Sequence, residues 1–170
     1  DFVVSEDAAL QLDGTVHALL TQKGLTLSLA ESCTGGLLGA LLTGRGGASD
    51  FFAGGVVSYS DEVKTRLLGV EEAVLQRCGA VSEETAALMA ENARRIFGTD
   101  LAVSVTGIAG PSGGTPEKPV GTFYVGYAAA EGVRVLHFLS AGSRERVRRH
   151  SAYWALDVIR RSMLGLKIRP

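Results

Sequence analysis

The stretch LSLAESCTGG, residues 27–36, decides the fold class of this chain. Its first half is an apolar run of strand length that stops at Ser32, and Gly35 and Gly36 follow where we predict a helix to begin. A strand that runs directly into a helix is typical of α/β proteins. At such a junction a hydroxyl can face a ligand while unpaired backbone N–H groups point at the same spot. We therefore predict a site for chemistry at Ser32.

Two further stretches repeat this arrangement. The apolar run that ends at residues 56–60 (VVSYS) is followed by Lys64, and the run at residues 101–106 is followed by the glycine-rich segment 107–114. If the three runs are parallel strands, their carboxyl ends share one edge of the sheet, where open α/β sheets bind ligands. We therefore expect the three following loops to converge on one crevice.

The rest of the chain supplies helices for both faces of the sheet and two more strands. We predict strands at 26–30, 52–58 and 101–106, a hairpin of strands at 121–130 and 133–139, and helices at 6–23, 34–43, 61–68, 82–97 and from 143 onward. In the helix before the third strand, the core face is expected to comprise Leu88, Met89, Ile96 and Phe97. The expected fold is a three-layer α/β/α sandwich with a mixed, partly parallel sheet, formed by residues 1–170 as a single domain.

Composition narrows the class of protein. The chain has 170 residues, of which 46% are hydrophobic and 21% charged, so it can bury a core without disulfides. Its two cysteines fit neither a disulfide framework nor a zinc site, and no signal peptide or membrane-length apolar run is present, so we expect a cytoplasmic protein. The first residue is not Met, which is compatible with a further domain upstream.

Positive charge is concentrated in the last helix. From residue 143 onward eight Lys or Arg stand against two Asp or Glu, although the whole chain has a net charge of −1. This charge indicates either a solvated helix face or an anion site. Arg144 and Arg148 are four residues apart and therefore project from the same face.

A serine nucleophile needs a base. None of the three histidines ends one of the convergent strands, whereas Lys64 follows the second strand by about one helical turn. A lysine buried in a crevice can take a serine proton because burial disfavours its charged form, and Tyr59 could relay that proton. The alternatives are a solvated surface lysine at 64 and a nucleophilic thiol at Cys33, which we instead expect to be a small buried residue.

Five blocks in this order resemble the CinA C-terminal domain family. They are AESCTGG (30–36), VVSYSDEVK (56–64), GAVSEET (79–85), TGIAGPSGGTPEKPVGT (106–122) and GSRERVRR (142–149). The resemblance implies a nicotinamide-nucleotide amidase, which hydrolyses nicotinamide mononucleotide to nicotinate mononucleotide and ammonia in pyridine nucleotide salvage. It also implies a catalytic serine and lysine, matched by Ser32 and Lys64, with Tyr59 at the family's nearby tyrosine.

The expected site combines both lines of argument. The oxyanion is expected to bind backbone N–H groups of Cys33, Thr34, Gly35 and Gly36. The expected substrate-binding residues are Glu31, Thr106, Gly107, Ala109, Gly110, Gly113, Arg144 and Arg148. We expect the protein to bind a small-molecule nucleotide and to need no metal or cofactor. We expect no binding to nucleic acid or to a membrane. A homo-oligomer is compatible with the sequence. The rival hypothesis is a non-catalytic nucleotide- or partner-binding module.

Overall fold

The computed structural model describes residues 6–167. The elements in chain order are α1 (Glu6–Lys23), β1 (Leu27–Glu31), α2 (Leu37–Thr43), the short 3-10 helix η1 (Ala48–Asp50), β2 (Phe52–Val57), α3 (Asp61–Leu68), α4 (Glu72–Cys78), α5 (Glu83–Phe97), β3 (Leu101–Gly107), β4 (Thr122–Ala129), β5 (Gly132–Leu139) and α6 (Arg144–Met163). All five predicted strands are present, within one or two residues of their predicted ends.

The sheet is mixed, as predicted. Its strand order is β2-β1-β3-β4-β5, with β1 parallel to both β2 and β3, and with β4 and β5 antiparallel. Glu31, the last residue of β1, pairs with Val57 of β2 and with Val105 of β3. The carboxyl ends of the three parallel strands therefore lie at one edge of the sheet.

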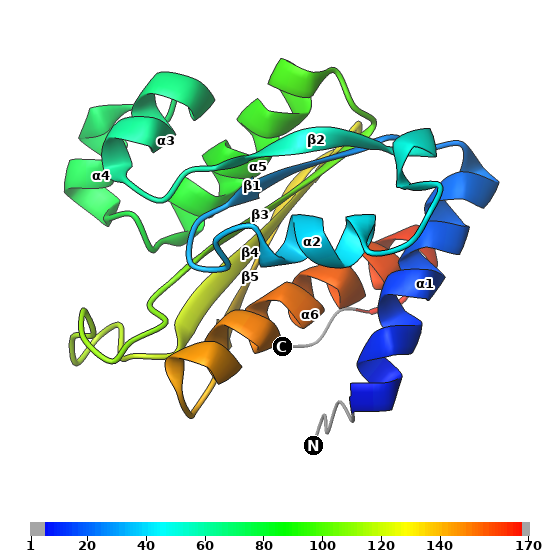
Figure 1. Cartoon of the computed structure of the whole chain (residues 1–170). Coiled ribbons are helices and arrows are strands. Elements are labelled where there is room, and N and C mark those ends of the chain that lie inside the picture. Colours follow the sequence, from blue (N-terminus) through cyan, green and yellow to red (C-terminus); the bar gives the residue numbers. More distant parts are fainter. Residues whose placement is uncertain (1–5, 168–170) are drawn as a thin grey trace.

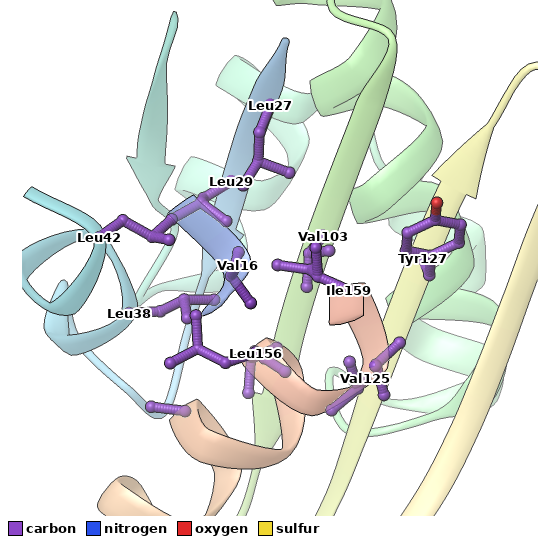
Figure 2. Packing of buried hydrophobic residues seen from close by; sticks show 14 of the residues in the cluster. Val16, Leu27, Leu29, Leu38, Leu42, Val103, Val125, Tyr127, Leu156 and Ile159 are labelled. Atoms are coloured by element: carbon purple, nitrogen blue, oxygen red, sulfur yellow. The ribbon is translucent and has the colours of Figure 1, made fainter. Parts of the chain in front are cut away.

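Helices cover both faces of the sheet. In Figure 1, α1, α2 and α6 lie on one side and α3, α4 and α5 on the other. The larger core lies under the first group, and Figure 2 shows Leu38 of α2 and Leu156 of α6 directed toward Leu29 and Val103 of the sheet. All four side chains are at most 1% exposed. No helix within residues 6–167 is both long and apolar enough to cross a membrane.

Serines and glycines set the ends of several helices. Ser60, Ser82 and Ser143 cap α3, α5 and α6, and each hydroxyl accepts a hydrogen bond from an N–H in the first turn. Gly69 and Gly98 end α3 and α5 in the left-handed conformation. The observed bounds of α3 and α5 agree closely with the predicted ranges 61–68 and 82–97.

Three predictions of local structure need correction. The helix α4 was not predicted, and α2 begins at Leu37 rather than Thr34 because residues 33–36 form a turn. Ile96 is 47% exposed and does not belong to the core face of α5. That face consists mainly of alanines around Met89, because a helix lying flat on a sheet needs small side chains at the contact.

Candidate active site

A cavity of about 220 Å³ lies at the carboxyl edge of the parallel strands. We call it the Ser32 cavity. It is lined by residues from five segments: Ser32, Cys33, Tyr59, Asp61, Lys64, Ala80, Val81, Thr106, Gly107, Ala109 and Arg144. The three loops predicted to converge do meet here, joined by the α4–α5 turn and the start of α6.

Ser32 is the first residue after β1. Its N–H donates to Val105 O of the neighbouring strand at 2.8 Å, which fixes its backbone to the sheet edge. The residue is 9% exposed and its side chain contributes to the cavity lining. The backbone of Ser32 is thus fixed to the sheet edge at a point where the residue lines the cavity.

Glu31, the residue before Ser32, binds the start of α2. Its buried carboxylate accepts hydrogen bonds from the N–H groups of Gly36, Leu38 and Gly39 at 3.0, 3.1 and 2.8 Å. These donors are the otherwise unpaired groups at the start of α2. Glu31 therefore caps α2 from inside the protein, which replaces the substrate contact predicted for it.

The same bonds reduce the set of oxyanion donors. Gly36 donates to Glu31, and Gly35 donates to Ser32 O at 3.0 Å, with both glycines in the left-handed region at φ 93° and 60°. Neither N–H is free for a ligand, which corrects the prediction for these two residues. The N–H groups of Cys33 and Thr34 contact the Cys33 sulfur and donate to no oxygen among residues 6–167, so these two remain as candidates.

Lys64 projects from the second turn of α3 into the cavity. It is 1% exposed, and its Nζ lies 3.3 Å from Asp61 Oδ1, an exposed carboxylate on the same helix. A fully buried lysine is uncommon, and this one lines the same cavity as Ser32. Within the described residues Nζ is not hydrogen-bonded to Ser32, and in ligand-free sites such bonds often form only when substrate binds.

Tyr59 and Arg144 close one side of the cavity. Arg144 donates to Tyr59 Oη at 2.6 Å and to Gly110 O at 2.8 Å. The guanidinium thus links the β2–α3 loop, the β3–β4 loop and the start of α6. The carbonyl of Gly110 accepts a hydrogen bond from Arg144, but Gly110 itself does not line the Ser32 cavity.

Arg148 lies elsewhere than predicted. It donates to Thr34 O at 2.8 Å and lines a second cavity of about 400 Å³ between α2 and α6. The second cavity is lined by Leu37, Leu41, Glu145, Arg148, Arg149 and Tyr153. The two arginines are four residues apart on α6, but Arg144 lines the Ser32 cavity and Arg148 lines the second cavity.

The glycine-rich loop contributes only its first residues. Thr106, Gly107 and Ala109 line the cavity, whereas Gly113 and Ser112 are exposed and outside it. Thr106 Oγ1 donates to Ala80 O at 2.7 Å, so its hydroxyl hydrogen is already engaged. A Cβ at Gly107 would lie 2.5 Å from the Cβ of Phe123, which explains why glycine is needed there.

The surroundings of Cys33 disfavour its thiolate. Burial raises the pKa of its thiol to about 11, and hydrogen bonds with Ser151 and with the neighbouring backbone offset only part of this effect. At neutral pH the sulfur is therefore protonated, and the thiol is a poor nucleophile. The expected interpretation of Cys33 as a small buried residue is confirmed by its 5% exposure.

Sequence reasoning missed three lining residues. Asp61 was not among the predicted site residues, and Ala80 and Val81 lie in a turn without a chemical signature. The block GAVSEET (79–85) was the available signal for these two. Within residues 6–167 no group of three or more His, Cys, Asp or Glu side chains could hold a metal ion.

Comparison with known proteins identifies the family. The family model described as the CinA C-terminal domain matches residues 9–163. This chain belongs to the CinA C-terminal domain family. The family assignment and the mixed α/β fold agree with the resemblance found in the sequence.

Relatives and solved structures give the extent of the match. A CinA-like protein of Citrifermentans bemidjiense is 48% identical over 169 residues, which are 99% of this chain and 41% of that protein. A CinA-like protein of Synechocystis is 51% identical over 151 residues, or 87% of this chain and 36% of that protein. The crystal structure of competence damage-inducible protein A from Klebsiella pneumoniae has a TM-score of 0.89 at 31% identity, covering 94% of this chain and 99% of that one. The chain thus spans about two fifths of the length of these curated relatives.

Proposed function

We propose that this CinA domain is a Ser/Lys amidohydrolase that converts nicotinamide mononucleotide and water to nicotinate mononucleotide and ammonia. The observation that carries the proposal is a serine and a fully buried lysine facing one cavity at the carboxyl edge of a parallel sheet. A module that only binds a ligand needs no such pair. The resemblance to the family supplies the substrate, and the geometry supports the reaction type.

In the first half-reaction Ser32 Oγ attacks the carboxamide carbon, and its proton passes to the amine of Lys64. The tetrahedral oxyanion is stabilised by the N–H groups of Cys33 and Thr34, each worth about 3 kcal/mol of barrier when aligned. The C–N bond then breaks, and Lys64 returns the proton to the nitrogen, which leaves as ammonia. An ester of Ser32 remains.

Water completes the cycle. Lys64 takes a proton from the water molecule, whose oxygen attacks the ester carbon. The bond to Ser32 Oγ then breaks, and the serine recovers its proton from Lys64. Tyr59, held by Arg144 at 2.6 Å, is placed to orient the groups that exchange protons. Asp61 Oδ1, 3.3 Å from Nζ, stabilises the ammonium form of Lys64 while it carries the proton.

An ammonia-release assay tests the proposal. We expect release from nicotinamide mononucleotide and none from free nicotinamide, with kcat of Ser32→Ala lowered by about a thousandfold or more. Cys33→Ala is the matched control in the adjacent residue and should retain most of the activity. Activity that survives in Ser32→Ala and disappears in Cys33→Ala would transfer the nucleophile to the thiol. Tight binding of the nucleotide without any release would favour the binding-module hypothesis.

A further inference from the structure

The TPEKP segment, residues 115–119, is not used by the proposed reaction. Its Lys118 extends to the α4–α5 turn and donates from Nζ to Cys78 O at 2.8 Å and to Val81 O at 2.7 Å. These carbonyls lie 40 and 37 residues earlier in the chain. Hydrogen bonds from an ammonium are about twice as strong as neutral ones, so this side chain fastens the long β3–β4 loop to the turn.

The remaining carbonyls of that turn are also bound by side chains. Gly79 O accepts from Ser82 Oγ at 3.0 Å and from Thr85 Oγ1 at 2.8 Å. Ala80 O accepts from Thr106 Oγ1 at 2.7 Å. Together with the two Lys118 bonds, four consecutive carbonyls are held by donors from three parts of the chain. Such complete pairing in a short turn fixes its backbone in one conformation.

Local structure prepares Lys118 for this contact. Thr115 N donates to Lys118 O at 2.9 Å, and Lys118 N donates to Thr115 Oγ1 at 3.0 Å. Pro116 lies inside this closed segment, where its fixed φ reduces the freedom of the chain. The lysine backbone is therefore anchored before its side chain crosses to the turn.

The turn matters because Ala80 and Val81 form part of the wall of the Ser32 cavity. We propose that Lys118 is a positioning residue that holds this wall against the substrate and so sets how tightly the substrate fits. The inference rests on the proposed amidase function. Lys118 does not line the cavity, so its effect is transmitted through the Ala80–Val81 backbone.

Kinetics of Lys118→Met test this role. The variant keeps the aliphatic stem and removes the donors, and we expect KM for nicotinamide mononucleotide to rise about tenfold with kcat within about threefold. Lys118→Arg, which again offers donors to both carbonyls, should restore much of the affinity. Lys23→Met, at an exposed lysine in the last turn of α1, is the matched control and should leave KM unchanged. A purely structural role would lower the active fraction and the apparent kcat without raising KM.

Backbone hydrogen exchange separates this inference from the proposed function. In Lys118→Met the amides of residues 79–82 should exchange faster than in the wild type, with little change in the central strands. Equal exchange in the two proteins, or an unchanged KM, would overturn the role of Lys118. A wild type that releases no ammonia would refute the reaction, while the exchange measurement would still test the contact. If Lys118→Met gives no folded protein, Lys118→Gln replaces it, and an unchanged KM there counts equally against the proposal.

Discussion

At the scale of single residues, Lys64 carries the strictest chemical requirement. A general base must be neutral when it takes a proton, and a guanidinium stays protonated at any working pH. We therefore expect Lys64→Arg to lose kcat almost as completely as Lys64→Ala in the ammonia-release assay. Lys64→Met, which preserves most of the buried volume, checks by thermal unfolding that the loss is not one of folding. If Lys64→Arg keeps most of the wild-type kcat, the residue supplies only positive charge and another group is the base.

His150 gives a pH-dependent stability that is separate from catalysis. Its Nδ1 lies 2.9 Å from Ser140 Oγ, and burial, helped by Arg146, lowers its pKa from the ordinary 6.5. Below pH 6.5 the unfolded chain therefore binds this proton more readily than the folded chain, so the free energy of unfolding falls as the pH decreases through that range. Urea unfolding at pH 7.5 and pH 5.5 should show a smaller difference for His150→Asn than for the wild type.

A control for that measurement lies on β5. His137 is exposed and stacks on Tyr124 at a ring-centroid distance of 4.8 Å. His137→Asn should preserve the pH dependence seen in the wild type. An unaltered pH dependence in His150→Asn would show that other groups cause it.

At the scale of elements, Glu31 joins β1 to α2. Its carboxylate holds three N–H groups of a helix only seven residues long, which has no side-chain cap of its own. Glu31→Ala leaves these buried donors unpaired, and we expect the free energy of unfolding to fall by about 3 kcal/mol. Glu31→Gln, with one acceptor oxygen left, should lose roughly half as much, as measured by chemical denaturation. A loss below about 0.5 kcal/mol in Glu31→Ala would mean that water replaces the carboxylate.

The elements themselves were largely predictable. Apolar runs of strand length identified β1 and β3, and Ser82 with Gly98 identified the ends of α5. The helix α4 was not predicted because its seven residues of mixed polarity show no clear hydrophobic periodicity. The start of α2 was misplaced because two left-handed glycines precede it. Local sequence does not reveal that the carboxylate of Glu31, at the end of the preceding strand, caps α2.

At the scale of the whole molecule, long-range contacts decide which residues form the site. The parallel edge of the sheet brings Ser32, Tyr59 and Thr106 together, and this followed from topology alone. The sequence did not predict that Arg144 and Arg148 line different cavities. Helical spacing places both on one face of α6 but does not show which segment each side chain contacts. Nor could the sequence show that Lys118 binds a turn 37 residues away.

The two arginines make the last prediction, which concerns the phosphate of the substrate. Arg144 lines the Ser32 cavity, whereas Arg148 holds Thr34 O and lines the second cavity. A contact between an arginine and a phosphate adds affinity only for substrates that carry a phosphate. Arg144→Ala should therefore raise KM for nicotinamide mononucleotide much more, by about tenfold or more, than for its dephosphorylated riboside.

Arg148→Ala should instead affect the two substrates alike, because it loosens the loop that carries the nucleophile. Steady-state kinetics on both substrates with both variants distinguish these roles, and the exposed Arg66 supplies a charge-matched control in Arg66→Ala. If Arg148→Ala discriminates between the substrates and Arg144→Ala does not, the phosphate reaches the cavity between α2 and α6.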